Sequence, residues 1–324
     1  MRKIERLWAF LAVIGFVVGI FGATPAAAQA TRTWVSGVGD DANPCSRTAP
    51  CKTFAGAISK TAAGGEINCL DPAGFGAVTI TKSIIIDCHF TEGGALASGN
   101  AIIINAGVND VVVLRGLDIL GVTAPVNGVR FLAGGALHIE DCVIRRFNAA
   151  NSFGISFQPS GTSRLYVRNS VLTENGNGAT GGGILIQPTG AAGSARFQIN
   201  STALQNNANI ALSVNTTGNT SPAGVIGMIE GSQVATSTTG IQLLTPVGAS
   251  GARVMVDDVT LSENSTALIA NGGSANLIVN NSVITSNTLG VSRLSGGVIN
   301  TFGNNQVVGN DTAGTFTLPA LTPS

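Results

Sequence analysis

The chain has 324 residues, of which 43 are glycines and only 10% are charged, a composition that fits neither a helical bundle nor ordinary disorder. Its 17 basic and 17 acidic residues balance and are thinly spread, so the sequence has no basic stripe that could follow a phosphate backbone. This distribution argues against a nucleic-acid partner.

Residues 1–30 have the pattern of a secretory signal peptide. A positively charged start, MRKIER, is followed by an apolar run from Leu7 to Gly22 and by the small-residue cleavage pattern Ala28-Gln29-Ala30. A membrane anchor is the alternative, but the apolar run is short for a helix that crosses a bilayer. We therefore expect cleavage, no stable membrane anchor afterwards, and a mature protein that is secreted or periplasmic.

Residues 31–65 are expected to form an N-terminal strand, a loop and a capping helix. Apolar residues at Phe54, Ala57, Ile58 and Ala62 fall at helical spacing, which predicts a short helix from about Thr53 to Ala62. Such a helix would cover the open end of a repeat fold.

Over residues 66–310 one motif recurs, made of an alternating strand, a polar corner and two more apolar positions; LHIEDCVI, LYVRNSVL and LIVNNSVI are copies. The last apolar residue recurs every 23 to 32 residues, at Phe90, Ile119, Ile144, Leu172, Leu204, Val234, Leu261, Ile284 and Val307. A second apolar column is expected at Leu114, Ile139, Val167, Ile199, Ile229, Val256, Val279 and Phe302. Periods of this length with short strands and no helix predict an all-β fold, a right-handed parallel β-helix solenoid of about nine or ten coils. An irregular tail is expected over 311–324.

Two polar columns accompany the apolar ones. The corner position is occupied by residue types that tolerate left-handed or turn backbone, at Asp87, Gly116, Asp141, Asn169, Ser201, Gly231, Asp258, Asn281 and Asn304. Three residues after the first apolar column, an asparagine ladder is expected at Asn175, Asn207, Asn264, Asn287 and Asn310. Turn chemistry accounts for both columns, and ligand contact is the alternative.

The N-terminal segment resembles the opening of the right-handed β-helix superfamily that contains pectate lyases and related polysaccharide lyases. The matching elements are Trp34-Val35-Ser36, Gly39-Asp40-Asp41, Pro50 to Phe54, the helix from Thr53 to Ala62, and Gly65-Glu66. The resemblance implies the fold. It names no reaction, because lyases, hydrolases, adhesins and non-catalytic proteins all share that fold.

The five cysteines are expected to form two disulfides in an oxidising compartment. Cys45 and Cys51 flank a short loop, and Cys69 and Cys88 align in adjacent coils, within disulfide range. Cys142 lies two coils from Cys88, about 9.6 Å at the usual ladder spacing, so it should be a free, buried thiol. Zinc binding is the alternative, but the sequence lacks the required Cys or His spacing.

The candidate site lies on the outward face of the main strands, because the inward residues form the core. Adjacent coils should bring Arg115, His138, Glu140, Tyr166 and Arg168 into one patch. A charge ladder with two shielding rings is the structural interpretation. A saccharide site is the functional one, since arginines bind uronate carboxylates and His or Tyr can take part in proton transfer.

A second candidate is the pair Glu230 and Asp257, which should stack in adjacent coils next to Asp258. Stacked carboxylates attract a cation, but a solvated acidic patch is the favoured interpretation. We assign no metal and no cofactor to the chain.

The favoured function is an exported, non-catalytic β-helix protein that binds glycans or other surface partners, with an acidic polysaccharide as the expected ligand. A polysaccharide lyase or glycoside hydrolase acting on an acidic polysaccharide is the alternative, and an adhesin-like spacer is the third hypothesis. No catalytic motif is recognisable, and the sequence does not indicate an oligomeric state.

Overall fold

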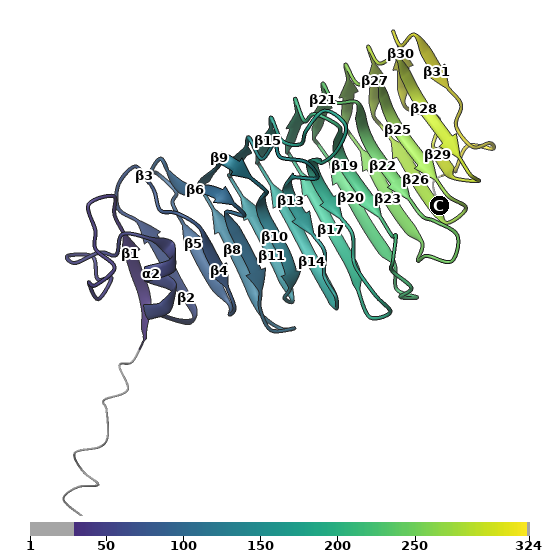
Figure 1. Ribbon diagram of the computed structural model, residues 1–324. Coiled ribbons are helices and arrows are strands. Elements are labelled where there is room, and N and C mark those ends of the chain that lie inside the picture. The colour runs from purple at the N-terminus through teal and green to yellow at the C-terminus, as the bar shows by residue number, and fades with distance from the viewer. Residues whose placement is uncertain (1–28, 323–324) are drawn as a thin grey trace, which may run out of the picture.

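The chain folds into an elongated stack of coils built from three sheets, each made of parallel strands (Figure 1). The structure is a computed structural model that describes residues 29–322, so all but the last two residues of the predicted signal peptide lie outside the described residues. One sheet has eleven strands, here called sheet 1, and the two others, sheets 2 and 3, have ten each. The chain visits sheets 1, 2 and 3 in turn and makes ten such coils. The prediction of an all-β parallel β-helix is confirmed.

Sheet 1 contains β1 (Ala30–Val35), β2 (Thr61–Cys69), β5 (Ile84–Asp87), β8 (Val111–Arg115), β11 (Ala136–Glu140), β14 (Thr162–Arg168), β17 (Ser194–Asn200), β20 (Val225–Glu230), β23 (Ala252–Asp257), β26 (Ala275–Asn280) and β29 (Val298–Thr301). Sheet 2 contains β3 (Ala73–Gly74), β6 (Gly93–Gly99), β9 (Leu117–Pro125), β12 (Val143–Arg145), β15 (Val171–Thr173), β18 (Ala203–Gln205), β21 (Gln233–Ala235), β24 (Thr260–Ser262), β27 (Val283–Thr285) and β30 (Gln306–Val308). Sheet 3 contains β4 (Val78–Ile80), β7 (Ile102–Asn105), β10 (Asn127–Ala133), β13 (Phe153–Phe157), β16 (Gly182–Ile186), β19 (Ile210–Asn215), β22 (Thr239–Leu244), β25 (Thr266–Asn271), β28 (Leu289–Leu294) and β31 (Thr312–Gly314).

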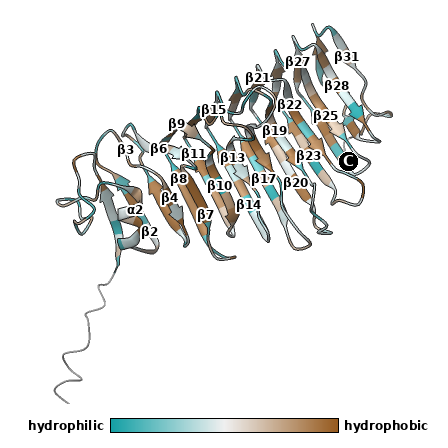
Figure 2. Cartoon of the chain, viewed as in Figure 1, coloured by the Kyte–Doolittle hydropathy of each residue, from teal (hydrophilic) through white to brown (hydrophobic). Residues whose placement is uncertain are grey.

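The core is a set of stacked apolar columns inside the coils. Residues alternate between the two faces of a strand, so every second side chain points inward, and Figure 2 shows apolar and polar residues alternating along many strands. Ile144, Leu172, Leu204 and Leu261 of the first predicted column are all fully buried. Large and small residues also complement each other across coils. A Cβ at Gly227 would lie 2.0 Å from the ring of Phe197, its partner in the preceding coil.

The predicted apolar columns contain two wrong assignments, Phe90 and Phe302. Phe90 is fully exposed at 105% relative accessibility, because residues 88–92 form a loop, and the strand pairing places the buried Ala95 beside Ile119 instead. At the other end of the molecule, Val279 pairs with Thr301 rather than with Phe302. The second error lies in the last coil, and the first lies in the second coil, in the loop that precedes β6.

Seven of the nine predicted corner residues have the left-handed backbone conformation that the sequence predicted. Their φ values lie between 44° and 65°, at Gly116, Asp141, Asn169, Ser201, Gly231, Asp258 and Asn281. Asp87 and Asn304 do not have this conformation. Asp87 instead pairs with Arg115 and therefore belongs to the outward face of sheet 1.

The asparagine ladder is a buried hydrogen-bonded row. The Nδ2 atom of Asn175 donates to Oδ1 of Asn207 at 3.1 Å, and that of Asn264 donates to Oδ1 of Asn287 at 3.1 Å. Between these two runs Ser237 occupies the row, and its backbone N–H donates to Oδ1 of Asn264. Buried amides with paired donors and acceptors stabilise the corners, so turn structure explains this row without a ligand.

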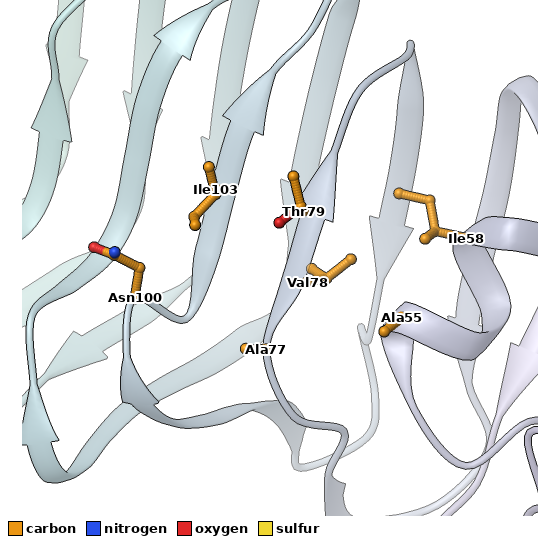
Figure 3. A pocket seen from close by; sticks show the side chains of 7 residues that line it. All are labelled: Ala55, Ile58, Ala77, Val78, Thr79, Asn100 and Ile103. Atoms are coloured by element: carbon orange, nitrogen blue, oxygen red, sulfur yellow. The ribbon is translucent and has the colours of Figure 1, made fainter.

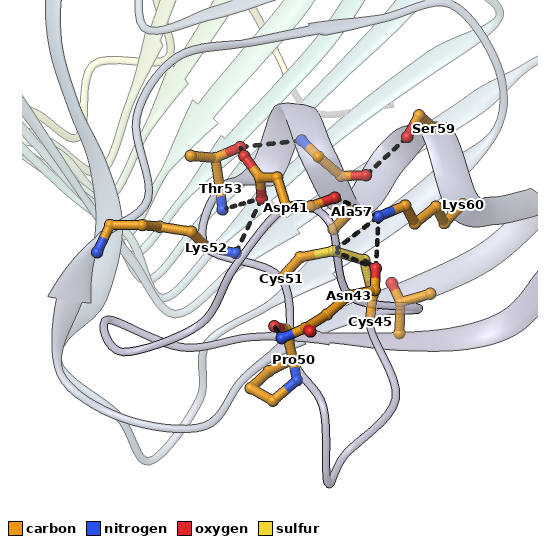
Figure 4. Close-up of a disulfide and its surroundings, with 12 residues drawn as sticks. Asp41, Asn43, Cys45, Pro50, Cys51, Lys52, Thr53, Ala57, Ser59 and Lys60 are labelled. Atoms are coloured by element: carbon orange, nitrogen blue, oxygen red, sulfur yellow. Dashed lines mark hydrogen bonds between the residues drawn. A yellow bond between two sulfur atoms is a disulfide. The ribbon is translucent and has the colours of Figure 1, made fainter.

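Both predicted disulfides are present, Cys45–Cys51 and Cys69–Cys88. Cys142 is free and buried, and burial raises the pKa of its thiol to about 12. Figure 4 shows the first disulfide under the capping helix, α2 (Phe54–Lys60), where the ammonium of Lys60 donates to the loop carbonyls of Asp41 and Asn43.

The helix α2 closes the N-terminal end of the core. Thr53 is its N-cap and accepts a hydrogen bond from the N–H of Gly56 at 2.9 Å, which satisfies one of the unpaired donors of the first turn. The helix ends at Lys60 rather than at Ala62, and β2 follows immediately, so the first coil begins five residues before position 66. No helix of the described residues is long and apolar enough to cross a bilayer.

The C-terminal residues form a second cap, in which a short strand is followed by an irregular segment that packs on the last coil. β31 extends the solenoid beyond the expected end at residue 310. The N–H groups of Thr317 and Leu321 then donate to the carbonyls of Ile299 and Thr301, both at 2.7 Å, and Phe316 packs against the core. These contacts cover the last strand of sheet 1, which would otherwise be an open edge.

Candidate functional site

The outward face of sheet 1 presents its side chains in three columns that run along the stack. Strands β8, β11, β14, β17, β20 and β23 pair in continuous register, so residues of successive coils stand side by side at about 4.8 Å. The last column contains Asp87, Arg115, Glu140, Arg168, Asn200, Glu230 and Asp257. The middle column contains Val113, His138, Tyr166, Gln198, Met228 and Met255.

The structure brings the five predicted site residues together on three adjacent strands. Arg115 comes from β8, His138 and Glu140 from β11, and Tyr166 and Arg168 from β14. We call this set the sheet-1 patch.

Glu140 joins the two arginines of the patch. Its Oε2 atom accepts from Nε of Arg115 at 3.0 Å and lies 3.4 Å from Nη2 of Arg168. The side chain of Glu140 is only 16% exposed, whereas that of Arg168 is 63% exposed. The hydrogen bond to Glu140 raises the pKa of Arg115, so this guanidinium stays cationic and does not act as a base.

His138 and Tyr166 form the aromatic part of the patch. Their ring centroids are 4.6 Å apart and their planes are inclined by 21°, a stacked arrangement. Burial lowers the pKa of His138, and the charges of Arg168 and Arg115 act in the same direction, against the opposing effect of Glu140. The imidazole is therefore neutral at neutral pH and presents a flat, partly exposed surface.

Three polar residues outside the predicted site, Asp87, His89 and Asp141, also border the patch. Nη1 of Arg115 lies 3.5 Å from Oδ2 of Asp87, so this arginine has a carboxylate on each side. The imidazole of His89 lies between Asp87, at 3.3 Å, and Asp141, at 3.0 Å. Hydrogen bonds from Asn169 and His89 lower the pKa of Asp141. The sequence contained a signal for Asp87, since it alternates with Ile86 in the strand pattern.

Glu230 and Asp257 stack in adjacent coils, as the repeat predicted. Each carboxylate accepts a hydrogen bond from an asparagine on its far side, Glu230 from Asn200 at 2.9 Å and Asp257 from Asn280 at 2.7 Å. Within residues 29–322, no three His, Cys, Asp or Glu side chains gather in a way that could hold a metal ion. The two carboxylates and their asparagine partners form a hydrogen-bonded acidic patch.

A hollow lies between α2 and sheet 3, and its lining contains no charged residue (Figure 3). Its walls are Ala55, Ile58, Ala77, Val78, Thr79, Asn100 and Ile103. Because none of these side chains titrates near neutral pH, the hollow offers packing surface rather than acid–base chemistry.

Solved structures provide a precedent for this architecture. Pectate lyase Pel9A superposes with a TM-score of 0.59 over 91% of this chain and 82% of its own, at 15% sequence identity. The chain has a pectate-lyase-like parallel β-helix. A rhamnogalacturonan lyase and a lacto-N-biosidase from Eubacterium ramulus superpose less well, each with a TM-score of 0.43, at 11% and 10% identity. They cover 82% and 87% of this chain and 73% and 66% of their own. No protein-family model and no curated protein sequence matches the sequence of this chain.

Proposed function

We propose that this protein is exported and binds a polysaccharide, without cleaving it, on the sheet-1 patch. The observation that carries the proposal is the gathering of two arginines, a stacked His–Tyr pair and a carboxylate on one rigid sheet face. Aromatic faces pack on sugar rings, and guanidinium groups hydrogen-bond to their carboxylates and hydroxyls. The two disulfides support export, since such bonds form in oxidising compartments.

The charges of the patch favour binding over catalysis. Proton abstraction needs a base whose pKa lies near the working pH. Arg115 is fixed in its cationic form by Glu140, and both arginines contact the same oxygen, Oε2, of that carboxylate. Lyase or hydrolase activity is the second candidate, favoured by one observation, the lowered pKa of His138, which keeps a proton acceptor on the surface.

The proposal is tested by measuring binding of pectate, a polymer of uronates, with dextran as an uncharged comparison. In the variant R115Q/E140Q/R168Q neutral amides replace the three charged groups, and Asp87, which loses Arg115, keeps its contact with His89 at 3.3 Å. We expect pectate affinity to fall about tenfold or more, as for the loss of one or two charge-assisted hydrogen bonds. The control R145Q/D118N/R146Q removes the same charges from sheet 2 and should bind as the unaltered protein does.

Two outcomes would contradict the proposal. The patch assignment is wrong if the triple variant, shown to be folded by its melting curve, binds pectate as tightly as the unaltered protein. Non-catalytic binding is wrong if unsaturated products or new reducing ends accumulate during the incubation, and loss of that activity in His138→Gln would then favour the second candidate.

A further inference from the structure

The hollow between α2 and sheet 3 is bounded by branched aliphatic side chains and by alanines. Figure 3 shows Ile58 of α2 and Ile103 of β7 on opposite sides of it, with Val78 of β4 between them. Ala55 and Ala77 are both exposed and line space that a larger side chain would fill. The volume of the hollow is about 350 Å³, which lies in the range of small-molecule sites.

The lining of this hollow offers few polar groups. Thr79 and Asn100 are the polar side chains among its seven lining residues, and none of the seven is aromatic. The Oδ1 atom of Asn100 already accepts a hydrogen bond from Nδ2 of Asn127 at 2.9 Å. A sugar would therefore bury hydroxyl groups with few partners and would find no ring to pack on. An aliphatic chain has no such groups and is stabilised in proportion to the apolar area that it buries.

A single cation stands beside the hollow. Arg130 of β10 pairs with Ile103, which in turn pairs with Thr79, so the three residues are neighbours in one outward column, about 4.8 Å apart. Among the described strands of sheet 3, only β10 and β28 contain a charged residue, Arg130 and Arg293. The positive charge of Arg130 is therefore a local feature of the end of the sheet at which the hollow lies.

The guanidinium of Arg130 has hydrogen-bonding capacity that the protein does not use. Its Nε atom is buried and has no hydrogen-bond partner, although the residue as a whole is partly exposed. No carboxylate oxygen of residues 29–322 lies within 4.0 Å of this guanidinium, whereas Arg115 and Arg168 both contact Glu140. Buried donors without partners are rare in folded proteins, because leaving them unpaired costs free energy. Arg130 is thus available to an anionic group held at the hollow.

We infer that the hollow binds one aliphatic chain with an anionic head group, which is the chemistry of a free fatty acid. The chain lies between Ile58 and Ile103, and its carboxylate binds the guanidinium of Arg130. Concave sites take individual molecules, whereas membrane contact uses an apolar face that protrudes into the lipid, so the ligand is a detached monomer. The inference goes beyond the proposed function, since the ligand, the sheet and the residues all differ from those of the sheet-1 patch.

The aliphatic part of the site is tested with monomeric decanoate and with uncharged decanol, whose affinities are measured by titration. Ala55→Trp places an indole ring in the hollow and should weaken both ligands at least about tenfold, because each methylene group that is no longer buried is worth roughly fourfold in affinity. The matched control is Ala192→Trp, in the exposed loop between β16 and β17. This control should bind both ligands as the unaltered protein does.

The anionic part of the site is tested by Arg130→Gln. This variant should bind decanoate about tenfold or more weakly, because a charge-assisted hydrogen bond is lost, and should bind decanol unchanged. Arg130→Lys keeps the charge and should retain part of the preference for decanoate. Arg293→Gln removes the charge of β28 and should bind both ligands as the unaltered protein does.

Several results would overturn the inference. It is wrong if the unaltered protein binds no decanoate, if folded Ala55→Trp binds it as tightly, or if Arg130→Gln keeps the preference for decanoate over decanol. Binding of phosphatidylglycerol vesicles without binding of monomeric decanoate would make the hollow a membrane contact, which also contradicts the inference. Pectate binding should be the same in Ala55→Trp and in the unaltered protein, so a failure here leaves the proposed function of the sheet-1 patch untouched.

Discussion

His138 is the residue of the sheet-1 patch whose charge is most sensitive to pH. Its pKa is lowered by burial, so the folded protein binds this proton less readily than the unfolded chain does. The unfolded state therefore gains protons first as the pH falls below about 6.5, and stability decreases with falling pH until the folded imidazole is also protonated. Above that window the effect is absent.

We predict that the imidazole resonance that disappears in His138→Gln titrates with a midpoint below the usual value of about 6.5. The melting temperature of the unaltered protein should also fall more steeply between neutral and mildly acidic pH than that of the variant. A midpoint above the usual value would show that the charge of Glu140 dominates over burial and would contradict the description of the stacked pair.

At the scale of elements, the fold depends on filled apolar columns. Ile144 of β12 is fully buried, and its neighbour Val143 is 36% exposed on the outer side of the same strand. We expect Ile144→Ala to lower the free energy of unfolding by about 2 to 5 kcal/mol, because it leaves a cavity between Ile119 and Leu172. Val143→Ala, measured in the same denaturant titration, should change it by much less. Equal effects of the two substitutions would mean that β12 has been assigned the wrong face.

The sequence was sufficient to predict the central coils, because each column there is constrained by neighbours on both sides. A shift of one residue in β11 or β14 would turn a whole set of apolar side chains toward solvent. Phe302 was assigned wrongly because the last coil has a neighbour on one side only, and a loop of different length moves the strand without breaking the alternation. Phe90 lies in the second coil, which has neighbours on both sides, but residues 88–92 form a loop before β6, so the expected column position falls in that loop. Ala95 could not be recognised, since a small residue in a glycine-rich segment gives no apolar signal.

The candidate site was predicted in part. The five residues of the sheet-1 patch follow from the alternation of β8, β11 and β14, but only two outward positions of each strand were considered. Each of these strands has at least one more outward position, two residues before the middle column, and Arg164 and Arg196 occupy it in β14 and β17. Ion pairs such as that of His89 with Asp141 depend on loop geometry that a repeat pattern does not contain.

At the scale of the whole molecule, the C-terminal cap closes the end of the stack that would otherwise expose a strand edge. The backbone of residues 317–321 occupies the hydrogen-bonding edge of β29. We predict that a chain ending at Gly314 melts at a lower temperature and self-associates more than the full chain, because an exposed strand edge pairs readily with another copy. Sedimentation at several concentrations would measure this. Thr317→Val removes the hydroxyl contacts with Ile299 and Arg293 but keeps the backbone bonds of the cap, so it is the control and should not associate. A truncated chain that sediments as the full chain does would show that the tail has no such role.

Both disulfides lie at the N-terminal end of the stack, so the two ends are held together by different kinds of bonds. Each coil contacts only its neighbours, so structure is lost from an end rather than from the middle. At the N-terminal end, Cys45–Cys51 holds the capping segment and Cys69–Cys88 ties the first two coils together. At the C-terminal end, the described residues close the stack with backbone hydrogen bonds and the packing of Phe316. We therefore expect the last coils of the described residues to unfold before the first coils, which the disulfides hold together.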